Sequence, residues 1–230
     1  MRQLYDLAGA EADRRFSPYC WRARMALAHK ELEVETIAWR YADKPVIART
    51  GESKVPVLVD GERWVHDSWA IANYLEDAYP ERPSLFGGPV GRALSRFYAN
   101  WADATLNPGL FPMLALDIWK HCAPQDQVYF RRSREARLGR TLEAAAADRE
   151  TRLPAFRASL APLRLTLAAQ PFLGGASPLY ADYAVFGAFQ WARAISDFVI
   201  LAEDDPIRTW RDRMMALYGG LASRAKAYPV

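Results

Sequence analysis

The sequence predicts two parts, an α/β layer over residues 1–80 and an all-helical part over residues 90–230. Three observations support this division. Before residue 80, apolar runs follow the order strand, helix, strand, helix, strand, strand, helix, which is typical of a layered α/β fold. Beyond residue 90, every apolar pattern has helical spacing. Between the two, residues 81–89 form a linker rich in chain breakers, with Pro83, Gly87, Gly88 and Pro89 following Pro80.

The composition indicates a globular protein with a sizeable core. Of the 230 residues, 51% are hydrophobic and 25% charged, and the net charge is only +3. The basic residues are scattered among acids, which disfavours nucleic-acid binding. A dense run, Arg131 to Arg134 with Arg137 and Arg140, falls in a predicted helix, and we interpret it as a solvated face.

The two cysteines and the chain start bear on the compartment. Cys20 and Cys122 have neither the spacing of a metal site nor that of a disulfide framework, so no metal is expected. No apolar run reaches the ~20 residues that cross a bilayer, and no secretory apolar region is recognisable at the start. We expect a cytoplasmic protein, where thiols stay reduced.

The first elements follow from local signals. Residues 3–7 are an apolar run that predicts the first strand. Ser17-Pro18 combines an N-cap hydroxyl with proline at the first helical position, which predicts a helix to about Lys30. Residues 33–37 predict a second strand. Residues 39–50 predict an irregular helical stretch that Pro45 breaks.

The stretch from Lys54 to Ser68 organises the rest of the α/β layer. Residues 57–59 are β-branched and apolar, which predicts a buried strand. Asp60-Gly61 predicts a tight hairpin turn, and residues 64–65 return as a second strand. His66-Asp67-Ser68 then opens a helix. Pro56 lies at the mouth of the first strand, where it donates to no ladder.

This layout predicts a site for an extended peptide. Val55 precedes a proline and is therefore held extended, so its N–H and C=O are free to pair with a ligand as an added strand would. A cis Val55-Pro56 bond would turn both groups outward. The helix that starts at Ser68 suits a carboxylate, and Asp67 suits an amine. Glutathione, a γ-glutamyl tripeptide, has these groups.

The helical half is predicted to contain five segments. Residues 90–120 form a long helix that bends near Pro108 and Pro112. Residues 126–147 and 150–169 are predicted to form two further helices. Residues 181–195 are apolar with small side chains, which predicts a central, tightly packed helix, and residues 206–218 form the last one.

The motifs carry a family resemblance. Ser17-Pro18-Tyr19-Cys20 has the pattern of thioredoxin-like proteins, with serine where glutaredoxins have their nucleophilic cysteine. Together with Lys54-Val55-Pro56, Asp67-Ser68 and the helical second half, the chain resembles a cytosolic glutathione transferase over nearly its whole length. Four segments, residues 17–22, 63–69, 149–154 and 201–206, are similar to the bacterial β-etherase-like branch, which cleaves lignin β-aryl ethers, and to its fungal relatives.

The resemblance implies roles for the glutathione site. Val55, before the presumed cis Pro56, would pair with the cysteinyl part of glutathione. Ser68 would hold the γ-glutamyl carboxylate and Asp67 the amine. The glycyl carboxylate would meet Lys54, Lys44 or Arg40, and the sequence does not choose among them. The resemblance also implies a homodimer.

Ser17 would donate a hydrogen bond to the glutathione sulfur. A free thiol with a pKa near ~8.5 is mostly protonated at neutral pH, and a hydroxyl donor favours the reactive thiolate. The alternative is that Ser17 is only an N-cap, worth ~1 kcal/mol to its helix. Tyr19 is a second possible donor, although its position after the proline favours a place in the substrate wall. Cys20 is expected to be a buried hydrophobe.

The acceptor site is expected between the two parts, lined by Tyr19 and by the 90–120 helix. Trp101 and Phe111 are its main candidates, with Leu106, Met113 and Trp119, and aromatic walls suit flat apolar molecules. Core packing explains each of them equally well.

Asp182 corresponds to the acid that starts the core helix in transferases, but Leu179 replaces the capping residue. Backbone N–H groups, or a cap at Ser177, are its expected partners.

Three functions remain open at this point. The first is a glutathione transferase that attacks an electrophilic carbon of an aromatic substrate, with β-aryl ether cleavage as its most specific form. The second is a non-catalytic carrier of glutathione and aromatic ligands. The third, a glutaredoxin-like thiol transferase, is disfavoured by the serine at position 17.

Overall fold

The first part of the chain forms a four-stranded mixed sheet in the computed structural model, which describes residues 1–230. The strands are β1 (Arg2–Leu7), β2 (Val34–Trp39), β3 (Val57–Asp60) and β4 (Arg63–His66). Their order is β2-β1-β3-β4, with β1 parallel to β2 and the other pairs antiparallel. The second strand lies slightly later than its apolar pattern indicates, because it pairs with β1 from Arg2↔Val34 to Leu7↔Trp39.

The hairpin between β3 and β4 turns one residue later than expected. Asp60 pairs with Arg63, so the two-residue turn is Gly61-Glu62 and not Asp60-Gly61. Gly61 has φ of 61°, which suits the first central position of a type II′ turn. Asp60 instead ends the strand, and its carboxylate accepts hydrogen bonds from Arg2, Tyr74 and Tyr79.

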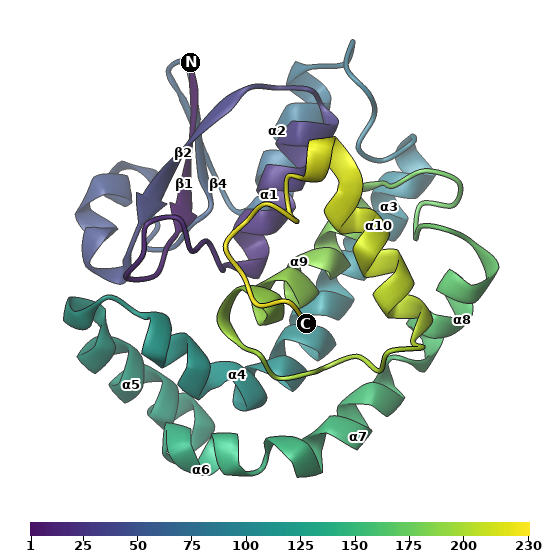
Figure 1. Ribbon diagram of the computed structural model, residues 1–230. Coiled ribbons are helices and arrows are strands. Elements are labelled where there is room, and N and C mark those ends of the chain that lie inside the picture. Colours follow the sequence, from purple (N-terminus) through teal and green to yellow (C-terminus); the bar gives the residue numbers. More distant parts are fainter.

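Helices flank this sheet (Figure 1). On one side lie α1 (Pro18–His29) and α2 (Ser68–Ala78), and on the other lies the 3₁₀ segment η1 (Tyr41–Thr50). Ser17 caps α1 as predicted, its Oγ accepting from the N–H of Cys20 at 3.2 Å. Pro45 stands inside η1, which agrees with the irregular helical stretch expected there.

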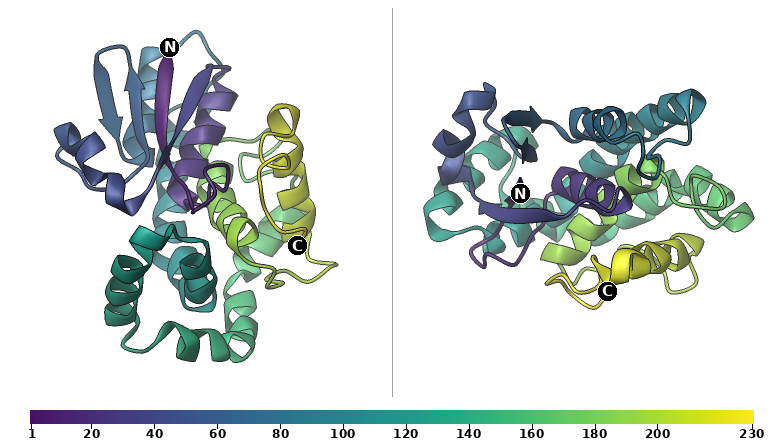
Figure 2. Two further views of the ribbon diagram at one scale, coloured as in Figure 1. Left: turned by 60° about the vertical axis from the view of Figure 1, so that its left-hand side comes forward. Right: turned by 90° about the horizontal axis from the view of Figure 1, so that it is seen from above.

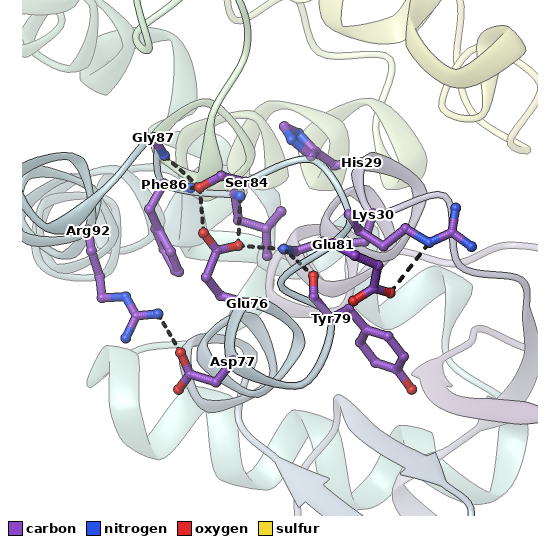
Figure 3. A network of polar contacts seen from close by, with 12 residues as sticks. His29, Lys30, Glu76, Asp77, Tyr79, Glu81, Ser84, Phe86, Gly87 and Arg92 are labelled. Atoms are coloured by element: carbon purple, nitrogen blue, oxygen red, sulfur yellow. Dashed lines mark hydrogen bonds and ion pairs between the residues drawn. The ribbon is translucent and has the colours of Figure 1, made fainter.

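The linker after α2 is fixed by a polar network (Figure 3). The Glu76 carboxylate accepts from the Leu85 N–H at 2.9 Å and from the Ser84 hydroxyl, and it pairs with Lys30 at 2.7 Å. Lys30 is fully buried and also donates to the Tyr79 carbonyl at 3.1 Å. The end of α1, the end of α2 and the linker are therefore joined at one point.

The second part contains eight α-helices and one π-helical segment. Their bounds are α3 (Pro89–Trp101), the π segment η2 (Ala102–Leu106), α4 (Asn107–His121), α5 (Pro124–Leu138), α6 (Leu142–Ala147), α7 (Arg149–Ser159), α8 (Ala161–Ala169), α9 (Tyr180–Ile195) and α10 (Pro206–Gly220). Figures 1 and 2 show α4 to α8 as an arc below and beside the central α9. No helix is long and apolar enough to span a membrane.

Three long segments are divided where the sequence suggested continuity. The 90–120 helix is interrupted by η2, just before Pro108, where proline lacks the N–H of a regular helix. The 126–147 segment breaks at Gly139, which takes a left-handed conformation with φ of 67°. The 150–169 segment breaks at Leu160, directly before α8, whose second residue is Pro162.

The central helix α9 is buried along nearly its whole length, as its small residues predict. A Cβ on Gly187 would lie 2.3 Å from the Pro18 carbonyl oxygen, so α9 and the start of α1 are in close contact. Asp182 accepts from the N–H groups of Leu173, Gly174 and Leu179 and from the indole of Trp210. Backbone N–H groups therefore replace the missing cap.

Candidate functional site

A cavity of about 270 Å³ lies between the α/β layer and the helical part. From the first part it is lined by Leu7, Phe16, Ser17, Pro18, Tyr19, Trp39, Tyr41, Lys44, Ser53, Lys54 and Val55. From the second part it is lined by Asp103, Asn107, Pro108, Phe111, Ile118, Tyr129, Phe130, Arg134, Arg137 and Trp191. Aromatic walls and a few polar groups make it suitable for a flat organic ligand.

Ser17 lies in this cavity at the N-terminus of α1 and is only 4% exposed. Its oxygen accepts from the Cys20 N–H at 3.2 Å, and its hydroxyl is also within hydrogen-bonding reach of the Cys20 thiol. In the first helical turn only the Tyr19 N–H has no partner in the chain, since Pro18 has no N–H and those of Cys20 and Trp21 donate to Ser17. The positive end of the helix dipole lies at the same place and favours negative charge. The arrangement can therefore donate a hydrogen bond to an anionic sulfur.

Tyr19 faces the helical part. Its hydroxyl accepts from Asn107 Nδ2 at 3.4 Å, and the Arg22 guanidinium lies over its ring at 4.9 Å. Burial, followed by the charge of Asp103, raises the pKa of the Tyr19 phenol above its usual value. Tyr19 therefore stays protonated at neutral pH and lies in the wall of the cavity.

Lys54 and Val55 form the opposite edge of the cavity, and the Val55-Pro56 bond is cis. Lys44 also lines the cavity, where it donates to the Tyr129 hydroxyl at 3.2 Å. Arg40 does not line it. Its guanidinium donates to the carbonyls of Gly9 and Ala10, so it holds the loop after β1.

Asp67 and Ser68 lie beside the cavity and are not part of its lining. Because Val57 pairs with His66, the next positions on the two strands are Pro56 and Asp67, which places both residues close to the cis bond. Asp67 caps α2 by accepting from the N–H groups of Trp69 and Ala70. Ser68 is 2% exposed, and its carbonyl accepts from Tyr180.

Of the five residues of the 90–120 helix that were expected in the acceptor wall, only Phe111 lines the cavity. Trp101 is not part of its lining. Asp103, Asn107 and Phe111 are four residues apart and share one side of the chain. Trp101 precedes Asp103 by two residues, which turns it about 200° away at helical spacing. It packs against the hydrophobic core instead.

The sequence analysis missed Arg134 and Arg137, which it assigned to a solvated face. They lie on α5, and their spacing of three residues gives them a common side. The signal that was available is this spacing together with Phe130 one turn earlier, which marks the side of α5 that packs inward.

The cysteines are not exposed at the site. Cys20 is fully buried, as expected, and burial raises the pKa of its thiol well above the usual value. Burial also raises the pKa of Cys122, to about 12. Neither thiol is therefore a nucleophile at neutral pH.

Two family models match the chain. The model of the glutathione S-transferase N-terminal domain matches residues 12–83, and that of the C-terminal domain matches residues 93–216. Among curated proteins, a probable glutathione S-transferase of Oryza sativa is 27% identical over 87% of this chain and 81% of its own length. A probable glutathione S-transferase of Nicotiana tabacum is also 27% identical, over 86% and 81%.

Solved structures agree in fold. Glutathione transferase GSTFuA3 of Phanerochaete chrysosporium has a TM-score of 0.77 and 27% identity over 95% of this chain and 92% of its own. The glutathione S-transferase CsGST63524 of Ceriporiopsis subvermispora, solved in complex with glutathione, has a TM-score of 0.80 and 24% identity, covering 95% and 96%. The two matched domains cover both parts of the fold, and the chain belongs to the glutathione S-transferase family.

Proposed function

We propose that this protein activates the thiol of glutathione for attack on an electrophilic carbon of an aromatic acceptor. The carrying observation is the position of Ser17, whose hydroxyl lies at the N-terminus of α1 in one cavity with Val55 and with aromatic residues of both parts. A hydroxyl donor and a helix N-terminus at one point favour a thiolate over a thiol.

Glutathione is proposed to bind along the edge formed by Val55 and Pro56. The Val55 backbone pairs with the cysteinyl residue as an added strand would. The N-terminus of α2 at Ser68 receives the γ-glutamyl carboxylate, and Asp67 receives the ammonium group. Lys54, which has no ion pair, receives the glycyl carboxylate. The complex of the similar CsGST63524 with glutathione supports this co-substrate.

The reaction is proposed to begin with loss of the thiol proton to solvent. The thiolate then forms a carbon–sulfur bond, and the leaving group departs with the electron pair of the bond that breaks. Each tenfold gain in thiolate is worth about 1.4 kcal/mol. The phenol of Tyr19, the ring of Phe111 and the neighbouring aromatic residues hold the acceptor.

Substitution of Ser17 tests the proposal. Ser17→Ala removes both the cap and the hydroxyl, Ser17→Gly removes the hydroxyl at a cost of only a few tenths of a kcal/mol to the helix, and Ser17→Thr keeps both. Because the hydroxyl stabilises the thiolate, its loss raises the thiol pKa. Two curves report the thiol pKa: the thiolate absorbance of bound glutathione against pH, and kcat/KM for an aromatic halide against pH. We expect the apparent pKa from both to be about one unit higher in Ser17→Ala and Ser17→Gly, and to be unchanged in Ser17→Thr. An unaltered titration in Ser17→Gly would remove Ser17 from the mechanism.

The β-aryl ether is proposed as the most specific acceptor, on the strength of the segments similar to the β-etherase-like branch. The test is a fluorogenic aryl ether beside a panel of aromatic halides, with dye displacement measured in parallel. Turnover of the ether places the protein in that branch. Displacement of dye by glutathione and by aromatic ligands, with no turnover of any electrophile, supports the alternative of a non-catalytic carrier.

A homodimer is proposed through α3. Val90, Leu94 and Phe97 are spaced by a helical turn and are 75%, 57% and 64% exposed, so α3 presents an apolar stripe to solvent. We expect the mass in light scattering to be twice the chain mass. Leu94→Glu is expected to halve it, and a monomeric parent would exclude the dimer.

A further inference from the structure

Two arginines on the cavity side of α5 have no acidic partner. Neither Arg134 nor Arg137 forms an ion pair with any carboxylate, although both line the same cavity as Ser17. The arginines at the two ends of the basic run, Arg131 and Arg140, do have acidic partners. Arg131 pairs with Glu135 and Glu143, and Arg140 pairs with Asp148. Arg132, Arg134 and Arg137 are the unpaired arginines of the run, and of these Arg134 and Arg137 line the cavity.

The two guanidinium groups are held by aromatic rings. Arg134 lies 4.9 Å from the Phe130 ring centroid, and Arg137 lies 4.8 Å from that of Phe111. Stacking of this kind fixes the plane of a guanidinium while its N–H edges remain free. Arg134 donates to Ser133 Oγ at 3.1 Å and lies within hydrogen-bonding reach of the Tyr41 and Tyr129 hydroxyls, whereas Arg137 has no hydrogen bond to the protein. The free edges match the fork geometry with which arginine binds a carboxylate.

The cavity as a whole has an excess of positive charge. Lys44 and Lys54 come from the first part and the two arginines from the second, and Asp103 is the single acid in the lining. Asp103 is already paired with the buried Arg22, at 2.8 Å. A concave site lined by charges of one sign concentrates ligands of the opposite sign.

Glutathione does not account for all of these cations. It has two carboxylates, of which the proposed site assigns one to the N-terminus of α2 and one to Lys54. Lys44 is engaged with Tyr129. The two arginines on α5 remain, and they lie on the wall formed by the helical part, where the acceptor is expected.

We infer that the acceptor is an aromatic acid whose carboxylate is received by Arg134 and Arg137. This inference rests on the proposed function, because it names the second substrate of the same cavity. Arg137 stacks on Phe111, so a ring that lies against Phe111 carries a substituent directly to its guanidinium. The arginines determine specificity, and they take no part in bond making or breaking.

The probe is a matched pair of aryl halides, para-chlorodinitrobenzoate and its amide. In both, the glutathione thiolate attacks the ring carbon that carries chlorine, the carbon–sulfur bond forms, and chloride leaves with the bonding pair. The pair differs only in the charge of the group opposite the chlorine. Each enzymatic rate is divided by the uncatalysed rate with glutathione, which removes the difference in intrinsic reactivity.

Three substitutions test the inference. Arg134→Gln and Arg137→Gln remove the cavity cations, and Arg132→Gln removes an equally unpaired arginine of the same helix that does not line the cavity. We expect kcat/KM for the benzoate to fall about tenfold or more in the first two, the effect of losing a charge-assisted hydrogen bond. In these two variants, kcat/KM for the amide and the KM for glutathione are expected to change less than about twofold. In Arg132→Gln, kcat/KM for the benzoate is also expected to change less than about twofold.

A binding measurement separates this inference from the proposed function. The glutathione conjugates of the benzoate and of the amide are titrated into the parent protein and the variants by calorimetry. Preference for the benzoate conjugate that is lost in Arg137→Gln supports the inference even if no turnover occurs. Equal affinity for the two conjugates overturns it. A rise in the KM for glutathione with both acceptors also overturns it, because the arginines would then hold the glycyl carboxylate.

Discussion

Gly187 connects the central helix to the candidate site. A methyl group at this position would lie 2.3 Å from the carbonyl oxygen of Pro18 and 3.4 Å from Cγ of Arg22. The obstacle is backbone, which a rotamer change does not relieve. Gly187→Ala therefore forces α9 and the start of α1 apart by roughly an ångström, and Ser17 directly precedes the residue that is displaced.

Two opposing effects set the size of the change. Overpacking of a well-packed core costs about 1–3 kcal/mol. Alanine is a better helix former than glycine by about 1 kcal/mol. The expected result is a net loss of about 1 kcal/mol, or a melting temperature lower by about 2–4 °C for a chain of this size. Misplacement of Ser17 is expected to lower kcat/KM for glutathione by about ten- to a hundredfold.

Urea unfolding and steady-state kinetics measure the two effects. Gly109→Ala on α4 is the matched control, because its new methyl group meets the side chain of Phe156, which is able to rotate, and not backbone. We expect Gly109→Ala to lose less stability than Gly187→Ala. A Gly187→Ala protein that is more stable than the parent and equally active would show that the helices are not in close contact at Pro18.

Three further predictions concern buried groups. Lys30→Met leaves Glu76 without its cation and is expected to cost about 3 kcal/mol at pH 7, at the low end of the range because the Glu76 side chain is 15% exposed. Burial alone would raise the pKa of Glu76, but Lys30, Ser84 and the Leu85 N–H hold this pKa below 4.5. The ion pair therefore contributes its full stabilisation above pH 4.5, and this stabilisation is lost as the pH falls through the lowered pKa. Urea titrations at pH 7 and pH 3 should therefore show the deficit of Lys30→Met shrinking in acid, and an equal deficit at both would contradict the assignment. Asp182→Ala leaves three N–H groups and the Trp210 indole unsatisfied, and we expect a loss of at least about 3 kcal/mol in the same assay. Cys20, with its raised pKa, is expected to react with a thiol reagent only on unfolding, and rapid labelling of the native protein would disprove its burial.

Local chemistry explains which elements the sequence analysis placed well. The N-cap of α1 depends on Ser17 and Pro18 alone, and the start of α10 on Asp205 and Pro206, so neighbouring residues suffice to predict them. The ends of β2 and the turn after β3 were misplaced by one or two residues, because strand partners and not local composition fix the register.

In the candidate site, too, residues of short local motifs were predicted, and residues whose position depends on helix packing were not. Ser17, Lys54 and Val55 were found because they belong to short motifs with a local physical meaning, and the structure places all three in one cavity. Trp101 lies outside the cavity lining because the rotation of each residue along the helix decides which side faces the cavity. Arg134 was assigned to solvent because Phe130 alone marks the inward side of α5, and one apolar residue in a basic run does not show which part of the protein that side meets.

The sequence by itself determined the fold class, the starts of α1, α2 and α10 and the position of Val55-Pro56 at the mouth of β3, since caps, turns and proline act over a few residues. Only the tertiary structure decided what the cavity contains. Residues more than a hundred positions apart, such as Ser17 and Arg134, meet because helices pack through their faces, and the choice of face depends on every other contact in the core. That choice brought the two arginines of α5 to the cavity, where their positive charge adds to that of Lys44 and Lys54.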